Sequence, residues 1–414
     1  MSASGPFLPY GRQAVDDDDI AAVVASLKSD WLTTGPAVGK FENAFAEKTG
    51  ARHAVACANG TAGLHLALLA LGIGHGDRVI APTLTFLATA NAARYVGADV
   101  VFADVDPDNG LLTPQTLEDA FARAGGVVKA VLAVHLAGQP ADMAALSAVA
   151  AGHGAVLVED ACHAIGGSYL VNDDPKGAEG RWTNVGACAH GAMAVFSLHP
   201  VKTITMGEGG VVTTNDDALA ARLRRARSHG MTRDADAFVN RGLAFGVDGA
   251  ANPWYYEMAD IGYNYRATDM QCALGASQLA KLDRFVARRG ELVALYDRAI
   301  GDLGHPALDF LKRRPDCRAA WHLYVVLVDF SVLDGDRAAL MNALSEKGVG
   351  TQVHYLPVHM QPYYKKLYGD LALPGAWRYY SRCLSLPLFP AMDDDDVLRV
   401  VAALGDGLDT VERV

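Results

Sequence analysis

The sequence has few basic residues, no paired cysteines and no long apolar run. Its 414 residues contain 36 Lys and Arg against 47 Asp and Glu, which gives a formal net charge of −11. An acidic chain lacks the positive surface with which proteins hold nucleic acid, so we expect no nucleic-acid partner. No run of about 18 uncharged apolar residues occurs, and the N-terminus lacks the basic start and apolar stretch of a signal peptide. We therefore expect a cytoplasmic protein that does not enter a membrane.

The cysteines follow no disulfide or metal-site pattern. All six are far apart in the sequence, with no C-x-x-C pair and no short Cys/His spacing of a metal site. Such spacing predicts free thiols in a reducing compartment and no metal site. Apolar residues make up 51% and charged residues 20% of the chain, an ordinary globular composition that excludes disorder, collagen and coiled coil.

What is present is an alternation of short apolar runs and helical patterns. We expect strands at 52–57, 78–81, 100–105, 129–135 and 155–159, and helices between them at 61–72, 86–97, 113–124 and 141–152. Continuous apolar strands separated by helices are typical of a mostly parallel sheet that is covered on both faces. The sequence therefore predicts an α/β fold.

The pattern changes after residue 195. A strand, a polar loop, a Gly-rich turn and another strand follow one another closely, and then a helical tract runs from Thr268 to about Ile300. Further elements are expected at 322–329 (strand), 336–347 (helix), 350–355 (strand) and from about Asp393 (helix). We predict a large domain at 32–267 and a small C-terminal α/β domain at 268–414 that includes 1–31. The polar or Gly-rich segments 171–184 and 232–253 are expected to be surface insertions.

Asn59-Gly60-Thr61 stands where the first strand gives way to a helix. Free backbone N–H groups and the Thr61 hydroxyl at such a helix start could hold a phosphate. Alternatively, Gly60 only turns the chain and Thr61 only caps the helix.

Asp160 and Lys202 are the other candidates. Asp160 closes a predicted parallel strand, and ligands bind at the carboxyl ends of such strands, although Asp160 could instead cap the next helix. Strand alternation points Glu159 the other way. Lys202 could be a surface lysine, but it lies on a loop constrained by Gly207, Gly209 and Gly210. Together, a lysine, a strand-end acid and a phosphate-type helix start match the needs of pyridoxal phosphate, which takes a Schiff-base lysine, an acid at the ring nitrogen and a phosphate cradle.

These residues stand in segments that resemble one family over nearly the whole chain. The segments are SDWLTTGP (29–36), NGTAGLHLAL (59–68), TFLATANA (85–92), VHLAGQPADM (134–143), EDACHAIG (159–166), FSLHPVKTITMGEGGVVTTND (196–216), RSHGMTRD (227–234) and GYNYRATDMQCALGASQL (262–279). The chain is similar to the DegT-type nucleotide-sugar aminotransferases, which depend on pyridoxal 5'-phosphate. The resemblance implies the aspartate-aminotransferase-like fold (PLP fold type I) and a homodimer with active sites at the subunit interface.

The resemblance also implies roles for individual residues. Lys202 and Asp160 would be catalytic, Lys202 as the Schiff-base lysine and Asp160 at the pyridinium nitrogen. The other residues implied to bind the cofactor are Gly60, Thr61 and Ser197 (phosphate), Phe86 (ring stacking), His163 (hydroxyl) and Asn264 (from the neighbouring subunit). Those implied to line the nucleotide-sugar site are Tyr10, Trp31, Leu32, Thr33, Gln352, His354 and Tyr355.

Four segments, one of them inside the segment 196–216 named above, narrow the expected reaction. FLPYGRQ, HPVKTITMGEGG, PWYYEM and GTQVHYLPVHMQPYY look most like the UDP-4-amino-4,6-dideoxy-N-acetyl-β-L-altrosamine transaminases of pseudaminic acid biosynthesis. The resemblance implies amino transfer from L-glutamate to carbon 4 of a UDP-linked 4-keto-6-deoxy-N-acetylhexosamine. Alternatives are another nucleotide 4-keto sugar, a PLP-dependent sugar lyase or dehydratase, or a non-catalytic nucleotide-sugar-binding protein. Lys202 argues against the dehydratases, because the related ones carry His in its place.

Overall fold

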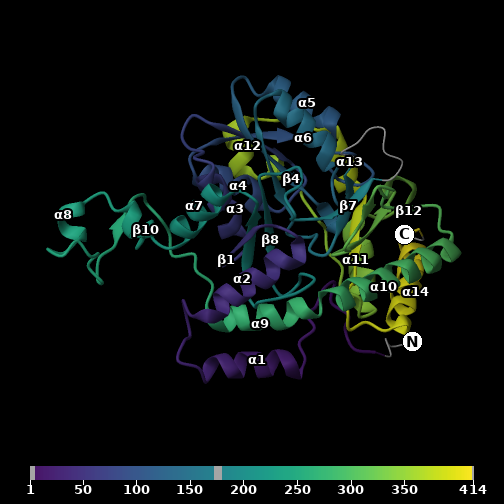
Figure 1. The fold of residues 1–414 in the computed structure, drawn as a ribbon. Helices are drawn as coiled ribbons and strands as arrows, with labels where there is room; N and C mark the ends of the chain where they lie inside the picture. Colours follow the sequence, from purple (N-terminus) through teal and green to yellow (C-terminus); the bar gives the residue numbers. More distant parts are fainter. Residues whose placement is uncertain (1–4, 172–179, 413–414) are drawn as a thin grey trace.

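The fold is built on a seven-stranded sheet, seen in a computed structural model that describes residues 5–171 and 180–412. The strand order is β1-β9-β8-β5-β4-β2-β3, and only β9 of these seven runs against the others (Figure 1). The strands are β1 (His53–Cys57), β2 (Arg78–Pro82), β3 (Asp99–Ala103), β4 (Val128–Val134), β5 (Val156–Asp160), β8 (Met193–Ser197) and β9 (Gly210–Thr214). The predicted mostly parallel α/β fold is confirmed.

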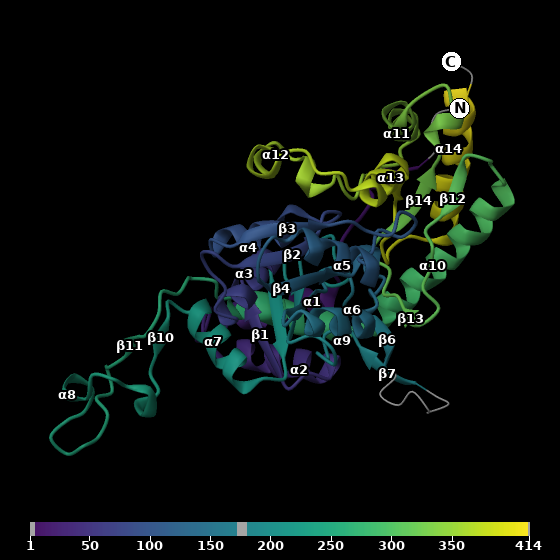
Figure 2. The ribbon, with the colours of Figure 1, turned by 90° about the horizontal axis from the view of Figure 1, so that it is seen from above.

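Helices cover this sheet on both faces, as the run of apolar strand residues requires. On one face α3 packs against α4 and α7, and on the other α5 packs against α6 (Figure 2). Their bounds are α3 (Gly60–Ala70), α4 (Leu87–Tyr95), α5 (Pro114–Arg123), α6 (Met143–Gly152) and α7 (Asp217–Arg227). All five strands predicted before residue 160 and the helices between them are present within one or two residues of the predicted limits.

Three helices from distant parts of the chain lie together below the large sheet in Figure 1. Helix α9 (Asp269–Ala280) lies between α1 (Asp17–Leu27) and α2 (Pro36–Thr49). Helix α1 begins with a capping box in which Asp16 and Asp19 accept each other's backbone N–H. Asp19 is fully buried and accepts from Ser277 and Gln278 of α9, so the N-terminal segment is fixed to the body.

A second apolar core lies beside the large sheet. It is formed by α10 (Leu282–Leu303), α11 (Arg337–Glu346), α14 (Asp394–Glu412) and an antiparallel sheet of order β12-β14-β15 (Leu308–Phe310, Tyr324–Val328, Cys383–Leu386). The core around the large sheet and this second core meet along α10. Phe285 packs in the core of the large sheet, and Leu292 packs in the second core. We propose on this basis the two predicted domains, joined through α9 and α10; the limits 32–267 and 268–414 stay a prediction.

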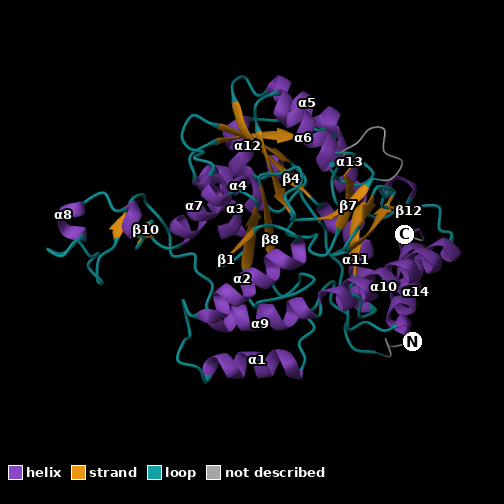
Figure 3. Ribbon diagram, viewed as in Figure 1, coloured by secondary structure: helices purple, strands orange, loops and turns teal. Residues whose placement is uncertain are grey.

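The smaller elements fill the connections. They are the helices α12 (Pro362–Tyr368) and α13 (Pro374–Arg382), the strands β6 (Ser168–Val171), β7 (Arg181–Asn184) and β13 (Cys317–Arg318), and the 3₁₀ turns Leu136–Gly138, Phe330–Val332 and Val358–Met360. Figure 3 shows the resulting pattern of strands enclosed by helices. None of the helices in the described residues is long and apolar enough to cross a membrane.

Two expectations for the C-terminal half were wrong. The tract from Thr268 to Ile300 is two helices rather than one, because the helix is interrupted at Lys281. Residues 350–355 form no strand; Gln352 makes a single bridge with Ser385 of β15. Beyond that bridge the chain leaves the sheet, and the side chains from Val353 to Leu356 line a cavity instead.

The two expected insertions differ in what the structure describes. Residues 229–262 extend far from the body as an arm that contains β10 (Met231–Thr232), a 3₁₀ turn (Ala235–Ala237), α8 (Arg241–Ala244) and β11 (Glu257–Met258) (Figures 1 and 2). The predicted insertion 232–253 lies in this arm. The other predicted insertion is 171–184. Its two ends belong to β6 and β7, and residues 172–179 lie outside the described residues.

Candidate active site

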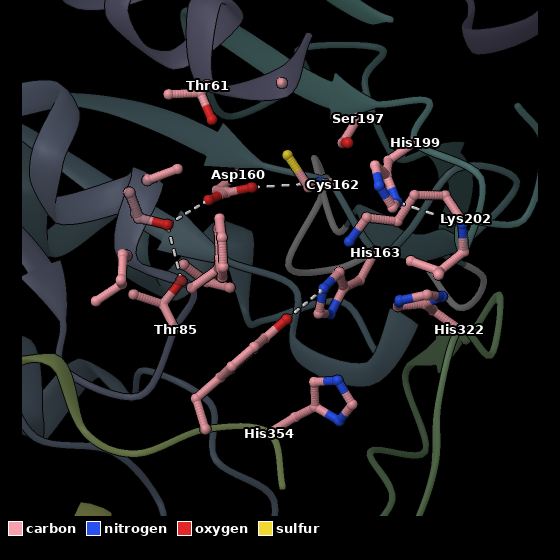
Figure 4. A pocket seen from close by; sticks show the side chains of 18 of the residues that line it. Thr61, Thr85, Asp160, Cys162, His163, Ser197, His199, Lys202, His322 and His354 are labelled. Atoms are coloured by element: carbon pink, nitrogen blue, oxygen red, sulfur yellow. Dashed lines mark hydrogen bonds between the residues drawn. The ribbon is translucent and has the colours of Figure 1, made fainter. Parts of the chain in front are cut away.

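A cavity of about 670 Å³ opens at the carboxyl ends of the central strands. Val134, Asp160 and Ser197 reach it from the ends of β4, β5 and β8, where ligands bind in open parallel sheets. The opposite wall comes from His322 and from the segment that carries His354 and Tyr355. Figure 4 shows these side chains around the cavity.

One end of the cavity is the N-terminus of α3. Asn59 caps this helix by accepting from the Ala62 N–H at 2.8 Å, so Thr61 is not the cap. The Thr61 and Ser197 side chains face the same end of the cavity (Figure 4). First-turn amides have no partner inside their own helix and carry the positive end of its dipole, so this corner suits a phosphate.

Gly60 is required by a close approach in this corner. A Cβ at position 60 would stand 2.8 Å from the Ser197 Cβ and 3.2 Å from its Cα, which is closer than real Cβ contacts. Both of these atoms belong to the end of strand β8 and not to the flexible tip of a side chain. The backbone of α3 can therefore lie against β8 only with glycine at this position.

Gly60→Ala should weaken cofactor binding, because the added methyl group pushes the helix start away from Ser197. We expect faster loss of the bound cofactor on dialysis, followed by its visible absorbance, with the folded structure retained by circular dichroism. Gly39→Ala is the matched control, since a Cβ there meets nothing within 4 Å. Equal retention by Gly60→Ala and Gly39→Ala would contradict the phosphate cradle.

Asp160 is the buried carboxylate of the site. Its Oδ2 accepts from the Thr89 hydroxyl at 2.6 Å and its Oδ1 from the Cys162 N–H at 3.2 Å, while Thr85 bonds Thr89 from behind at 2.8 Å (Figure 4). These donors fix the carboxylate in place at the edge of the cavity. Glu159 points the other way, as strand alternation predicts, and pairs with His135 at 3.1 Å.

Lys202 enters the cavity from the loop after β8. Its backbone N–H donates to the His199 carbonyl at 2.9 Å, which holds the loop in a tight turn. Burial lowers the pKa of the Lys202 amine below its ordinary 10.5, although the nearby Asp160 opposes this shift. A lowered pKa increases the neutral fraction of the amine, which is the form that attacks a carbonyl carbon.

Aromatic side chains form the rest of the wall. The Phe86 ring is 55% exposed and lies 6.1 Å from the Tyr355 ring. The Tyr355 hydroxyl hydrogen-bonds the His163 Nε2 at 3.1 Å, and His354 lies between the rings of Tyr355 and Tyr10. A flat ring could therefore lie between Phe86 and the strand ends, with Asp160 and His163 at its edge.

The comparisons with known proteins agree with this chemistry. The pattern of the DegT/DnrJ/EryC1/StrS aminotransferase family matches residues 13–405. The chain belongs to this family. It is 40% identical over 403 residues to the spore coat polysaccharide biosynthesis protein SpsC of Bacillus subtilis, and the match covers 97% of both chains.

Solved structures of sugar aminotransferases share the fold. Helicobacter pylori PseC, an aminotransferase of pseudaminic acid biosynthesis, superposes with a TM-score of 0.84 at 27% identity, covering 98% of this chain and 100% of that one. The putative sugar aminotransferase Spr1654 of Streptococcus pneumoniae, solved in PLP and PMP forms, superposes with a TM-score of 0.83 at 24% identity, covering 98% of this chain and 99% of the PLP-form chain. The chain is thus a PLP-dependent sugar aminotransferase.

The residues of the cavity fit pyridoxal 5'-phosphate. The corner at Gly60, Thr61 and Ser197 suits its phosphate, the Asp160 carboxylate suits a protonated ring nitrogen, and Lys202 brings an amine to the same cavity. No group of three or more His, Cys, Asp or Glu side chains in the described residues could hold a metal ion.

The structure brings together most of the residues singled out in the sequence. Those that line the cavity are Tyr10, Gly60, Thr61, Phe86, Asp160, His163, Ser197, Lys202, Gln352, His354 and Tyr355. Trp31, Leu32, Thr33 and Asn264 do not line it within one chain. Trp31 and Leu32 are about half exposed. Thr33 forms an isolated β-bridge with Thr268, and Asn264 forms one with Ser228. Their predicted roles stay predictions.

Sequence reasoning missed several lining residues. These are Thr85, Thr89, Cys162, His199, Glu208 and His322. Thr85 and Thr89 stand inside the recognised segment TFLATANA, but nothing in that segment indicates that their hydroxyl pair supports Asp160. His199 and Cys162 stand inside motifs that were recognised, three residues before Lys202 and two after Asp160, and proximity in sequence was the available signal. His322 lies at the start of a predicted strand and gave no signal of its own.

Proposed function

We propose that this enzyme moves the amino group of L-glutamate to carbon 4 of UDP-2-acetamido-2,6-dideoxy-β-L-arabino-hexos-4-ulose. The products are UDP-4-amino-4,6-dideoxy-N-acetyl-β-L-altrosamine and 2-oxoglutarate. The observation that carries amino transfer is the joint position of Lys202, Asp160 and the α3 phosphate corner in one cavity. The choice of sugar is supported by the similarity to PseC over nearly the whole of both chains.

In this proposal the chain's own residues hold the reactants and move protons. Bound pyridoxal phosphate supplies an aldehyde that carries the amino group and a ring that withdraws electrons from the carbon losing a proton. The Lys202 amine would hold the cofactor in the cavity and, when free, would take the proton from the α-carbon of glutamate and deliver one to carbon 4 of the sugar. Asp160 would keep the ring nitrogen protonated, and Phe86 would supply an aromatic surface for the ring.

We also propose a homodimer with shared active sites. Asn264 is exposed and does not line the cavity of its own chain. Trp31 and Leu32 are exposed apolar residues, and the Leu32 carbonyl accepts from the N–H of Asp269, five residues after Asn264. The arm carries more exposed apolar side chains, among them Val239, Trp254 and Ile261. A second subunit would cover these surfaces and bring Asn264 to its partner's cofactor.

The product identifies the substrate. With L-glutamate and the UDP-linked 4-keto sugar made by a 5-inverting UDP-N-acetylglucosamine dehydratase, we expect a 4-amino product of altro configuration, checked by mass spectrometry and NMR. Formation of 2-oxoglutarate from glutamate without amination of this sugar would keep the aminotransferase and overturn the proposed acceptor.

One observation favours a second acceptor. The chain shares 40% identity with SpsC, a spore coat polysaccharide biosynthesis protein, against 27% with PseC. The second candidate function is therefore amination of a different nucleotide 4-keto sugar that is used for a polysaccharide. Offering the enzyme the non-inverted UDP-4-keto sugar and a dTDP-4-keto sugar in the same assay separates the two candidates by relative kcat/KM.

A further inference from the structure

Two histidines beside Lys202 have ring nitrogens with no partner. His163 and His322 are only 6% and 4% exposed, both line the cavity, and their ring centroids are 4.4 Å apart. The Nδ1 of each has no hydrogen-bond partner among the described residues. Buried polar atoms in native proteins are nearly always paired, so these two enclosed nitrogens are exceptions. The His163 Nε2 is bonded to Tyr355, which leaves the other edge of the His322 ring as the part of the pair that can meet a ligand in the cavity. Figure 4 shows both rings on the Lys202 side of the cavity.

A buried cation stands behind His322. Arg289 of α10 is fully buried, and its Nη1 donates to the carbonyls of His322 and Leu388 at 3.3 and 2.8 Å. Its Nε and Nη2 have no hydrogen-bond partner, and none of the described carboxylates forms an ion pair with it. Burial lowers the pKa of Arg289 to about 10, so the guanidinium is still charged at neutral pH.

The electrostatic potential at His322 is therefore positive. Burial lowers the pKa of His322 well below its ordinary value, and Lys202 and Arg289 lower it further. Burial and Lys202 act on the pKa of His163 in the same way. The two imidazoles are thus neutral, and the potential that opposes their protonation stabilises an anion placed against their N–H groups.

The amino donor needs such a place. Glutamate carries carboxylates, yet within one chain Lys202 is the only Lys or Arg among the described residues that line the cavity, and its amine is needed for the reaction. The carboxylates of the lining, Asp160 and Glu208, would repel the donor. The His163 and His322 corner combines neutral N–H donors, a positive potential and a position close enough to Lys202 for its charge to act on both rings.

We propose that His322, with His163 beside it and Arg289 behind it, binds a carboxylate of the amino donor. This inference rests on the proposed function only in taking glutamate as the donor, and it does not depend on which sugar accepts the amine. His322 then acts in the glutamate half of the reaction and not in the sugar half.

His322→Phe tests this by keeping the ring and removing the N–H. Each half-reaction is followed separately in single turnover by the absorbance of the holoenzyme, glutamate with the PLP form and keto sugar with the PMP form. We expect the glutamate concentration for half-maximal rate to rise about 10- to 100-fold, the effect of one hydrogen bond to a charged group. The corresponding value for the keto sugar should change less than about twofold. His322→Asn, which keeps an N–H donor, should recover part of the loss, and His153→Phe, a surface change, should behave as the wild type.

Glutarate provides a measurement without turnover. This dicarboxylate has no amino group, so its dissociation constant from the holoenzyme, measured by calorimetry, reports carboxylate binding alone. We expect His322→Phe to weaken it by the same factor as glutamate. A crystal structure of the wild-type holoenzyme with glutarate should place a carboxylate against His322, which keeps the inference testable if His322→Phe fails to fold.

Three outcomes would overturn the inference. They are unchanged glutamate and glutarate affinity in His322→Phe, an equal loss in both half-reactions, and a glutarate carboxylate bound away from His322. Failure of the proposed acceptor looks different: glutamate would still convert the PLP form to the PMP form, and only the sugar half-reaction would be missing.

Discussion

Lys202→Ala should reduce turnover by at least about 10³-fold, because it removes both the covalent attachment of the cofactor and the amine that moves the proton. The fold should survive, since Lys202 is only partly buried and its hydrogen bond to His199 uses the backbone. Borohydride reduction of the wild type should attach the cofactor irreversibly to the peptide that contains Lys202, and peptide mass spectrometry of the variant should show no attachment.

The control for this change is Lys129→Ala. Lys129 is an exposed residue of β4 that does not line the cavity, so both the labelled peptide and the rate should match the wild type. Partial recovery of the Lys202→Ala rate by added methylamine would show that the lost group is a proton-transferring amine. A Lys202→Ala enzyme with normal turnover would rule out the mechanism proposed above.

The sheet was predictable because its signal is local. Runs such as 129–135 are apolar without interruption, and they are separated by helices of ordinary length, so their type and order follow from periodicity alone. The same reasoning failed at 350–355, where an apolar pattern is used to line a cavity. Nothing in that segment's own sequence distinguishes a strand that stays in a sheet from one that leaves it after a single bridge at Gln352.

A site residue was predictable only where its type and its place at a strand end or turn point to a role without knowledge of its neighbours in space. Lys202 and Asp160 follow from the ends of strands, and Gly60 follows from a strand-to-helix turn, so each could be located along the chain. Thr89 acts through its contact with Asp160, 71 residues away, and His322 lies beside His163, which is also distant from it in the sequence. Such contacts depend on how the helices and the second core pack, which no local pattern specifies. The roles predicted for Trp31 and Asn264 require a second subunit.

Asp160→Asn should lower turnover by about 10²- to 10⁴-fold while leaving cofactor binding largely intact. The substitution keeps the size of the side chain but removes the charge that favours a protonated ring nitrogen, and an unprotonated ring is a weaker electron sink. The loss should appear in both half-reactions, because both pass through the same deprotonation chemistry, and it should appear in the maximal rates rather than in the affinity for glutamate or sugar.

Thr89→Val separates the charge of Asp160 from its support. Valine has nearly the shape of threonine, so the change removes the 2.6 Å hydrogen bond to Asp160 and leaves the carboxylate with the Cys162 N–H alone. Since the charge remains and Thr89 acts on the ring only through Asp160, we expect a loss of only about 3- to 10-fold, which is part of the effect of one hydrogen bond to a charged group. We therefore expect the wild type to have the highest turnover, Thr89→Val a slightly lower one and Asp160→Asn a far lower one. This order follows only if the charge of Asp160 itself acts on the ring. Equal losses in the two variants would mean that Asp160 matters for packing at the strand end, and near-normal turnover of Asp160→Asn would remove it from the mechanism.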